Sequence, residues 1–286
     1  MNSISAARDS SSRRRSQARR RESNRQLMPW PLAVPAAVGV LFLLAPLVGL
    51  LARAPWSGLF RILSDADVLT ALRLSLVSAT AATAVSIVLG VPLAWALARV
   101  RLRGISALRA LVTLPLVLPP VVGGVALLLA LGRRGLLGQY LDQWFGVTLP
   151  FTTPGVIVAE TFVAMPFLII TVEGAFRAAD RGLEEAACTL GATRLTVFRR
   201  VTLPLIRPSL VAGAVLCWAR ALGEFGATIT FAGNFPGVTQ TMPLKVYLAL
   251  ESDPQAAMAL SLVLLAVCVL VLAALRDRWL RPSGRS

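Results

Sequence analysis

A few charged side chains interrupt long apolar stretches of this sequence, and their positions are the first that could serve chemistry. Arg220 and Glu224 are four residues apart, so on a helix they would share one face, and Glu160 is an acid in another apolar stretch. Charge in an apolar medium must be paired or must meet water. These residues are therefore candidates for a structural ion pair, which has the slightly stronger case, or for the wall of a polar pathway.

Neutral hydrogen-bonding side chains follow this pair along the chain. A carboxylate repels an anion, so we expect Glu160 and Glu224 to act in gating or in holding the nearby arginine, and not to bind an anionic ligand. The neutral donors could contact a polar solute in such a pathway, or they could satisfy the backbone of their own helix. They are Thr228, Thr230 and Asn234.

Catalytic chemistry has no support in the sequence. There is no histidine, which excludes imidazole metal ligation and histidine acid–base catalysis. The three cysteines are scattered and odd in number, so they form neither a disulfide framework nor a zinc or redox spacing. We predict no catalytic residue, no metal site and no enzymatic activity, and we interpret the cysteines as small apolar residues.

A polar segment from residue 180 onward has the spacing of a short amphipathic helix. Asp180 is placed to cap its start, and Gly191 is placed to end it. Four apolar residues recur at i, i+3, i+4 and i+7, which puts them on one face. They are Leu183, Ala186, Ala187 and Leu190.

A second short helix is expected to start near Thr193, to carry Arg194, Arg199 and Arg200, and to stop before Pro204. A basic amphipathic segment of this kind often lies on lipid headgroups. Small residues on the first helix argue against that interpretation, because they offer lipid little apolar area. They favour close docking in a groove of a protein partner.

Membrane-spanning helices must position all of these residues. The chain of 286 residues is 56% hydrophobic and only 15% charged, which is too apolar for an ordinary soluble protein. A span needs about 20 mostly apolar residues. Six stretches qualify: 29–51, 74–98, 107–131, 154–172, 208–230 and 255–275.

Proline interrupts several of these stretches. Broken helices are tolerated in lipid where neighbours or a water-lined cavity satisfy the freed backbone groups, so the spans are expected to pack around a pathway. For any single proline, a structural kink is the better explanation. The residues are Pro92, Pro115, Pro119, Pro120 and Pro166.

The distribution of charge predicts the topology. The polar segments on one side of the six stretches carry all of the net charge of +15, whereas the loops on the other side carry no net charge. Positive charge collects on the cytoplasmic side, so both termini are predicted to be cytoplasmic in a multi-pass protein of the cell membrane.

Residues 1–28 are predicted to be a disordered, arginine-rich cytoplasmic tail that contacts anionic lipid. Nucleic-acid binding is the alternative, with a weaker case, and we expect no nucleic-acid partner. We also expect the first apolar stretch to be retained, because it is longer than the core of a typical cleaved signal peptide.

The segment around the amphipathic helix resembles the EAA loop of ABC importer permeases. The resemblance rests on Glu185, Ala186 and Ala187, then Gly191 after three residues, and then a Val-x-Leu-Pro run that ends at Pro204. It implies an all-α type I importer permease with about six transmembrane helices and a coupling loop at about 180–206. The loop, with Glu184 beside its motif, would form a coupling helix that docks on a cytoplasmic ATPase.

The resemblance implies a permease domain at 29–280, a short cytoplasmic tail at 281–286, and three partners. These are an ATP-binding subunit, an extracytoplasmic binding protein and a second copy of the permease. The chain has no phosphate-binding Gly-x4-Gly-Lys loop of its own, so we expect ATP to be bound by the partner and no cofactor to be bound here. A passive channel or a receptor is the second hypothesis, and the coupling loop argues against it because neither needs one. A membrane-embedded enzyme is the third, and the sequence shows none of the catalytic residues that it would need.

Three further segments resemble molybdate permeases: residues 114–124, 221–234 and 241–250. The resemblance covers about residues 65–280 and implies ATP-driven import of molybdate, with tungstate as a related substrate. Sulfate permeases share a variant of the Gly-Glu-Phe-Gly run at 223–226, so a sulfate or thiosulfate importer is the alternative.

Overall fold

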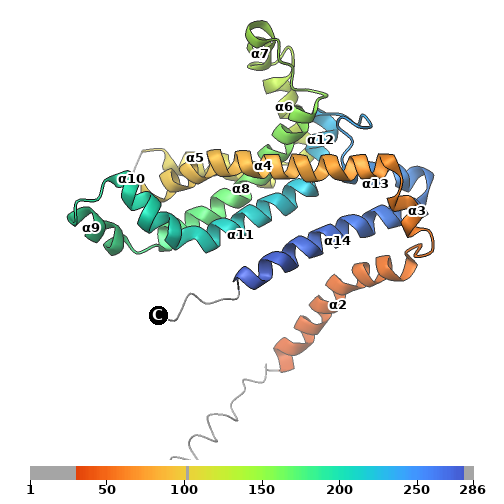
Figure 1. The fold of residues 1–286 in the computed structure, drawn as a ribbon, viewed down its shortest axis with the longest axis horizontal. Helices are drawn as coiled ribbons and strands as arrows, with labels where there is room; N and C mark the ends of the chain where they lie inside the picture. Colours follow the sequence, from red (N-terminus) through yellow and green to blue (C-terminus); the bar gives the residue numbers. More distant parts are fainter. Residues whose placement is uncertain (1–29, 101–102, 280–286) are drawn as a thin grey trace, which may run out of the picture. The chain divides into compact units, whose positions relative to one another are not determined.

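The computed structural model describes residues 30–100 and 103–279, and all regular structure within these ranges is helical (Figure 1). The predicted tails at 1–28 and 281–286 lie outside the described residues. The long helices are α2 (Trp30–Arg53), α4 (Ala66–Arg99), α8 (Thr153–Ala178), α11 (Leu203–Leu222) and α14 (Pro254–Trp279). The shorter ones are α3 (Leu59–Leu63), α5 (Ile105–Val117), α6 (Pro120–Leu131), α7 (Gly138–Phe145), α9 (Arg181–Thr189), α10 (Arg194–Val197), the π-helical turn η1 (Phe198–Thr202), α12 (Gly226–Phe231) and α13 (Met242–Ser252).

Helix α2 belongs to a unit that ends at Arg53, and the rest of the chain forms a second unit. It is 24 residues long, which exceeds the roughly 20 residues that a span needs. Its most apolar window has a mean hydropathy of 2.4 and is 0% buried within the protein. Leu41, Phe42 and Leu43 are all exposed, so this helix requires an apolar surrounding such as lipid.

The second unit has its core where α4, α8 and α11 pack together along their lengths (Figure 1). Small residues line the contacts. A Cβ atom on Gly90 of α4 would approach Ile169 of α8 to 3.2 Å, and one on Gly213 of α11 would approach Leu168 to 3.2 Å. Lipid gives helices no hydrophobic reason to associate, so close packing over small residues is what holds such a bundle together.

Four of the predicted spans are confirmed as single helices, namely α2, α4, α8 and α14. The predicted span at 107–131 is instead a pair of helices, α5 and α6, bent by 119°. Pro119 precedes α6 and Pro120 is its first residue, so neither can donate the N–H that would continue α5. Within the described residues, five helices are long and apolar enough to cross a membrane, or up to six if the bent pair is one span.

The predicted span at 208–230 is also interrupted. Helix α11 ends at Leu222, and the chain turns at Gly223 before α12 begins at Gly226. Helix α12 then packs closely on α6: a Cβ atom on Gly226 would lie 2.7 Å from the Cβ of Pro120. Two short helices, one from each broken stretch, therefore lie against each other.

The prediction that the second loop helix stops before Pro204 is wrong. Helix α10 continues through η1 into α11, and the N–H of Leu203 bonds to the carbonyl of Phe198 across the π turn. Pro204 is the second residue of α11 and directly follows the π turn, so the N–H that it lacks falls where the regular pattern of helix hydrogen bonds is already interrupted. The wider turn carries the helix past the proline without a break.

Candidate functional site

Helix α9 has both of the ends that the sequence predicts. The Asp180 carboxylate accepts a hydrogen bond from the N–H of Gly182 at 2.8 Å and caps the start. At the other end Gly191 has a backbone φ of +85°. Its N–H bonds to the carbonyl of Cys188 at 2.9 Å, and the N–H of Ala192 bonds to the carbonyl of Ala187 at 3.1 Å. This pair of bonds is a Schellman motif, in which glycine is the favoured residue.

One side of α9 is attached to the bundle through Glu184. Its Oε1 lies 2.9 Å from Nη2 of Arg99 at the end of α4, and it accepts a hydrogen bond from the hydroxyl of Thr202 in η1 at 3.0 Å. The Arg99 side chain is only 8% exposed and that of Glu184 23%. Glu184 thus faces its own chain, whereas Glu185 is exposed.

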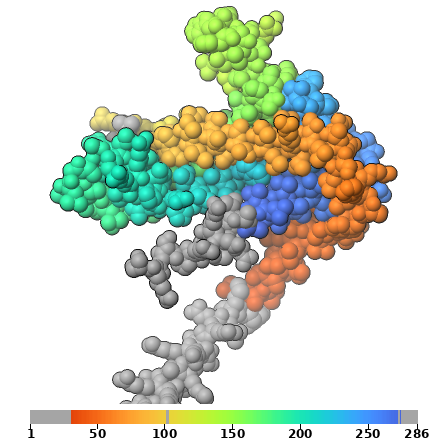
Figure 2. Space-filling view, viewed as in Figure 1, coloured from red at the N-terminus to blue at the C-terminus, as the bar shows by residue number. Residues whose placement is uncertain are grey.

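The predicted apolar stripe of α9 is uncovered. Leu183 is 49% exposed and Leu190 is 89% exposed, while Ala186 is exposed and Ala187 is half-buried between them. Leu195 of α10 adds a further apolar side chain that is 59% exposed. Figure 2 shows α9 and α10 at the surface, at one end of the bundle. An apolar stripe rimmed by polar residues is typical of a docking surface for a protein partner.

Arg220 and Glu224 form the ion pair that their spacing suggests, with 2.6 Å between Nη2 and Oε2. The prediction that both lie on one helix is wrong, because Arg220 is in the last turn of α11 and Glu224 lies in the break before α12. The other Glu224 oxygen accepts a hydrogen bond from the N–H of Ala227 at 2.9 Å. This carboxylate is 1% exposed and ties the end of α11 to the start of α12.

The three neutral donors differ in what they contact. Thr230 donates to the carbonyl of Gly226 at 2.8 Å, so its hydroxyl satisfies its own helix. The hydroxyl of Thr228 and the amide oxygen of Asn234 are buried without a hydrogen-bond partner in the described part of the chain. Buried polar atoms are normally paired. Thr228 and Asn234 therefore retain capacity to bind water or a solute.

Glu160 lies in a polar connection that the sequence did not reveal. Its Oε1 accepts a hydrogen bond from the hydroxyl of Ser78 at 2.8 Å, and the hydroxyl oxygen of Ser75 accepts one from the N–H of Met242 at 2.7 Å. Two serines on one face of α4 thus contact α8 and the start of α13. The only signal was the i, i+3 spacing of two small polar residues in an apolar stretch.

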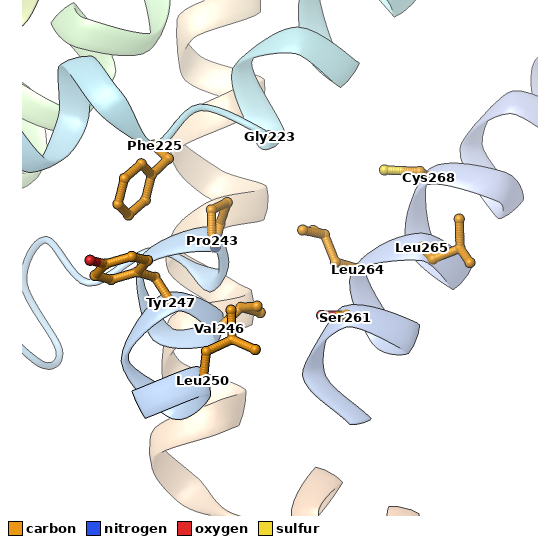
Figure 3. A pocket seen from close by; sticks show the side chains of 10 residues that line it. All are labelled: Gly223, Phe225, Pro243, Val246, Tyr247, Leu250, Ser261, Leu264, Leu265 and Cys268. Atoms are coloured by element: carbon orange, nitrogen blue, oxygen red, sulfur yellow. The ribbon is translucent and has the colours of Figure 1, made fainter. Parts of the chain in front are cut away.

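A cavity of about 450 Å³ lies beside the break between α11 and α12, against α13 and α14 (Figure 3). Phe225 and Tyr247 contact each other on one side of it, with ring centroids 5.0 Å apart. Leu264 and Cys268 of α14 lie on the other side. The lining is almost wholly apolar and offers an anion few hydrogen-bond donors, so this cavity has the wrong chemistry for an oxyanion site.

The chain matches a family profile described as "Binding-protein-dependent transport system inner membrane component" over residues 86–282. It is similar to the molybdenum transport system permease protein ModB of Mycobacterium tuberculosis, with 50% identity over 85% of this chain and 92% of that protein. The sulfate transport system permease protein CysT of Salmonella typhimurium is 39% identical over 81% of this chain and 85% of that protein.

The fold is similar to that of a solved bacterial ABC transporter involved in the import of the acidic polysaccharide alginate. The TM-score is 0.70 at 19% sequence identity, over 92% of this chain and 99% of that one. At this identity the likeness concerns the fold, which is that of an importer permease bundle.

Proposed function

Because this chain belongs to the family of binding-protein-dependent transport system inner membrane components, we propose that it is the permease subunit of an ATP-driven importer of molybdate. The observation that carries the proposal is the 50% identity to a molybdenum transport permease over 92% of that protein's length. The chain has no phosphate-binding loop, so ATP hydrolysis is assigned to a separate cytoplasmic subunit.

The assembly has three further components in this proposal. A cytoplasmic ATP-binding subunit docks on α9, an extracytoplasmic binding protein delivers the oxyanion, and a second copy of the chain completes the pathway. Dependence on a binding protein is part of the family description. The uncovered stripe around Ala186 and Leu190 supports the docking surface, because an exposed apolar face rimmed by polar residues is typical of a site that a protein partner covers.

The contacts of α9 suggest how ATP-driven movement reaches the membrane helices. Glu184 joins α9 to Arg99 at the end of α4 and to Thr202, the last residue of η1 before α11. The last turn of α11 carries Arg220, whose partner Glu224 holds the start of α12. A displacement of α9 would therefore move two core helices, and through α11 it would move the interrupted region where Thr228 and Asn234 lie.

The orientation follows from charge. The termini and the loop that contains α9 are cytoplasmic in this proposal, because the basic residues collect on that side. Entry of the oxyanion is then from the opposite side. Arg220, with its side chain 28% exposed, and the unpartnered polar atoms of Thr228 and Asn234 are the groups proposed to contact it on the way.

Competition during uptake tests the substrate. Cells that depend on this permease are given labelled molybdate with an excess of unlabelled tungstate or sulfate. We expect tungstate to abolish uptake of the label and sulfate to leave most of it, with cells that lack the permease as the control. The opposite order of competition would favour the sulfate importer, which is the second candidate because of the 39% identity to a sulfate permease.

A further inference from the structure

A second cavity, of about 670 Å³, opens at the end of the bundle that carries α9. It lies where α4 ends, α5 begins and α8 leads into α9. Its lining combines apolar residues at the end of α4, among them Leu97 and Val100, with four arginines. The arginines are Arg103, Arg109, Arg177 and Arg181.

Two of the four arginines are held in place by an ion pair, and the other two have no ion-pair partner among the described residues. Arg109 and Arg177 both contact Oε1 of Glu173, each at 2.8 Å, so one carboxylate orients two guanidinium groups. Arg103 and Arg181 have no carboxylate within 4.0 Å among the described residues. The cavity therefore has an excess of positive charge that the described chain leaves uncompensated.

The start of α5 adds to this positive potential. Ile105, the first residue of α5, lines the cavity, and Gly104 before it provides no side-chain cap. The first N–H groups of a helix carry a partial positive charge and are ready to bind an anion. Asp180 precedes Arg181 in the chain, but it caps α9 through Gly182 and is not among the residues that line the cavity. The cavity thus combines positive groups that can bind an anion with an apolar wall that can contact carbon atoms of the same ligand.

We propose that this cavity binds the phosphate group of an anionic membrane lipid. A free oxyanion would gain nothing from the apolar wall, whereas a lipid places its glycerol and acyl carbons there and its phosphate among the arginines. The cavity lies at the ends of α4 and α8, where membrane spans meet the headgroup region. In the proposed orientation this is the cytoplasmic leaflet, which is rich in anionic lipid. The proposal relies on that orientation but not on which oxyanion is transported.

Lipid retention by the purified complex tests the proposal. The full-length permease with its ATPase partner is equilibrated in neutral detergent with phosphatidylglycerol or with phosphatidylcholine, and retained lipid is counted by native mass spectrometry. Arg103→Gln and Arg181→Gln are combined, because neither exposed side chain has an ion-pair partner whose loss would disturb the fold. We expect selective retention of phosphatidylglycerol, and an affinity about tenfold or more weaker in the double variant.

The matched control combines Arg199→Gln and Arg200→Gln, which remove two exposed arginines of η1 outside the cavity. If the control and the test variant lose equal amounts of phosphatidylglycerol, the lipid is held by general surface charge and the proposed site is wrong. Equal retention of the two lipids would overturn it as well. If inorganic phosphate or molybdate at millimolar concentration binds through Arg103 and Arg181 in lipid-free complex and phosphatidylglycerol is not retained, the ligand is a free oxyanion. The measurement is made in detergent, so its result is separable from any failure of the proposed orientation or transport activity.

Discussion

At the scale of single residues, Gly191 is the position where the backbone most clearly requires glycine. Its φ of +85° is one that residues with a side chain rarely adopt. A Cβ atom added there would meet nothing within 4 Å, so space does not restrict the position. The backbone conformation alone therefore selects glycine, and it fixes the angle at which the chain leaves α9.

This distinction predicts different outcomes for two substitutions of similar size. Gly191→Val should strain the turn by roughly 1–2 kcal/mol, whereas Gly191→Asn should be milder because asparagine tolerates the left-handed region. We expect the valine variant to lose most transport and most binding-protein-stimulated ATPase activity in the reconstituted complex, and the asparagine variant to keep most of both. Amounts of protein in the membrane are the control. Equal activities of the two variants would contradict the role given to this turn.

At the scale of elements, α9 is held by one carboxylate. Glu184 is the described acid that contacts Arg99, whose side chain is 8% exposed and whose Nε and Nη1 atoms have no partner in the described chain. A buried guanidinium that loses its carboxylate is left uncompensated, which is expensive. Among the described residues, this single side chain makes the side-chain hydrogen bonds from α9 to α4 and η1.

Glu184→Ala should therefore impair coupling, although it leaves the exposed stripe of α9 intact. We expect a loss of roughly 1–3 kcal/mol in stability, less than for a fully buried pair because Glu184 is 23% exposed. Glu185→Ala removes the neighbouring exposed carboxylate and should have little effect. Thermal unfolding and stimulated ATPase activity of the two purified complexes are the measurements. Similar losses in both variants would mean that Glu184 has no special part in holding α9.

The elements also show which parts of the structure the sequence could predict. Four spans and α9 were predictable because runs of about 20 apolar residues and an i, i+3, i+4 stripe are local signals. The breaks after α5 and α11 were missed because proline and glycine are compatible with both a kinked and an interrupted helix. The serine contacts were missed because their partners lie 82 and 167 residues away in the chain.

At the scale of the whole molecule, the proposed orientation makes opposite ends of the bundle accessible from opposite sides of the membrane. Cys188 on α9 is exposed, Cys217 is buried in the core, and Cys268 is partly exposed. Leu136, in the loop between α6 and α7, is 76% exposed. The natural cysteines thus provide a reporter on α9, and a substitution at Leu136 provides one on the other side.

In a Cys268→Ala background, a membrane-impermeant maleimide should label Cys188 only in inside-out vesicles. The ATPase subunit should protect Cys188 when it is bound, because the thiol lies on the helix that we expect it to cover. A Leu136→Cys, Cys188→Ser variant should be labelled only in right-side-out vesicles. Labelling is read by mass spectrometry, and Cys188→Ser alone gives the background. Modification of Cys188 from the outside would reverse the topology and remove the basis for ATPase docking.

The π turn η1 fixes the rotation of one half of a helix relative to the other. Each residue of an α-helix turns the chain by about 100°, so a turn with one extra residue sets α11 out of phase with α10 by about that angle. If η1 became a regular α-helix with all of its residues kept, α11 would have to rotate about its own axis by about that angle, whereas deletion of one residue of η1 would give a regular helix and leave α11 in place. After such a rotation Thr202 would no longer face Glu184, and Arg220 would point elsewhere in the bundle. The direction in which Arg220 points is thus set by η1, some 20 residues earlier in the chain. This turn lies at the end of the bundle where the ATP-binding partner would dock.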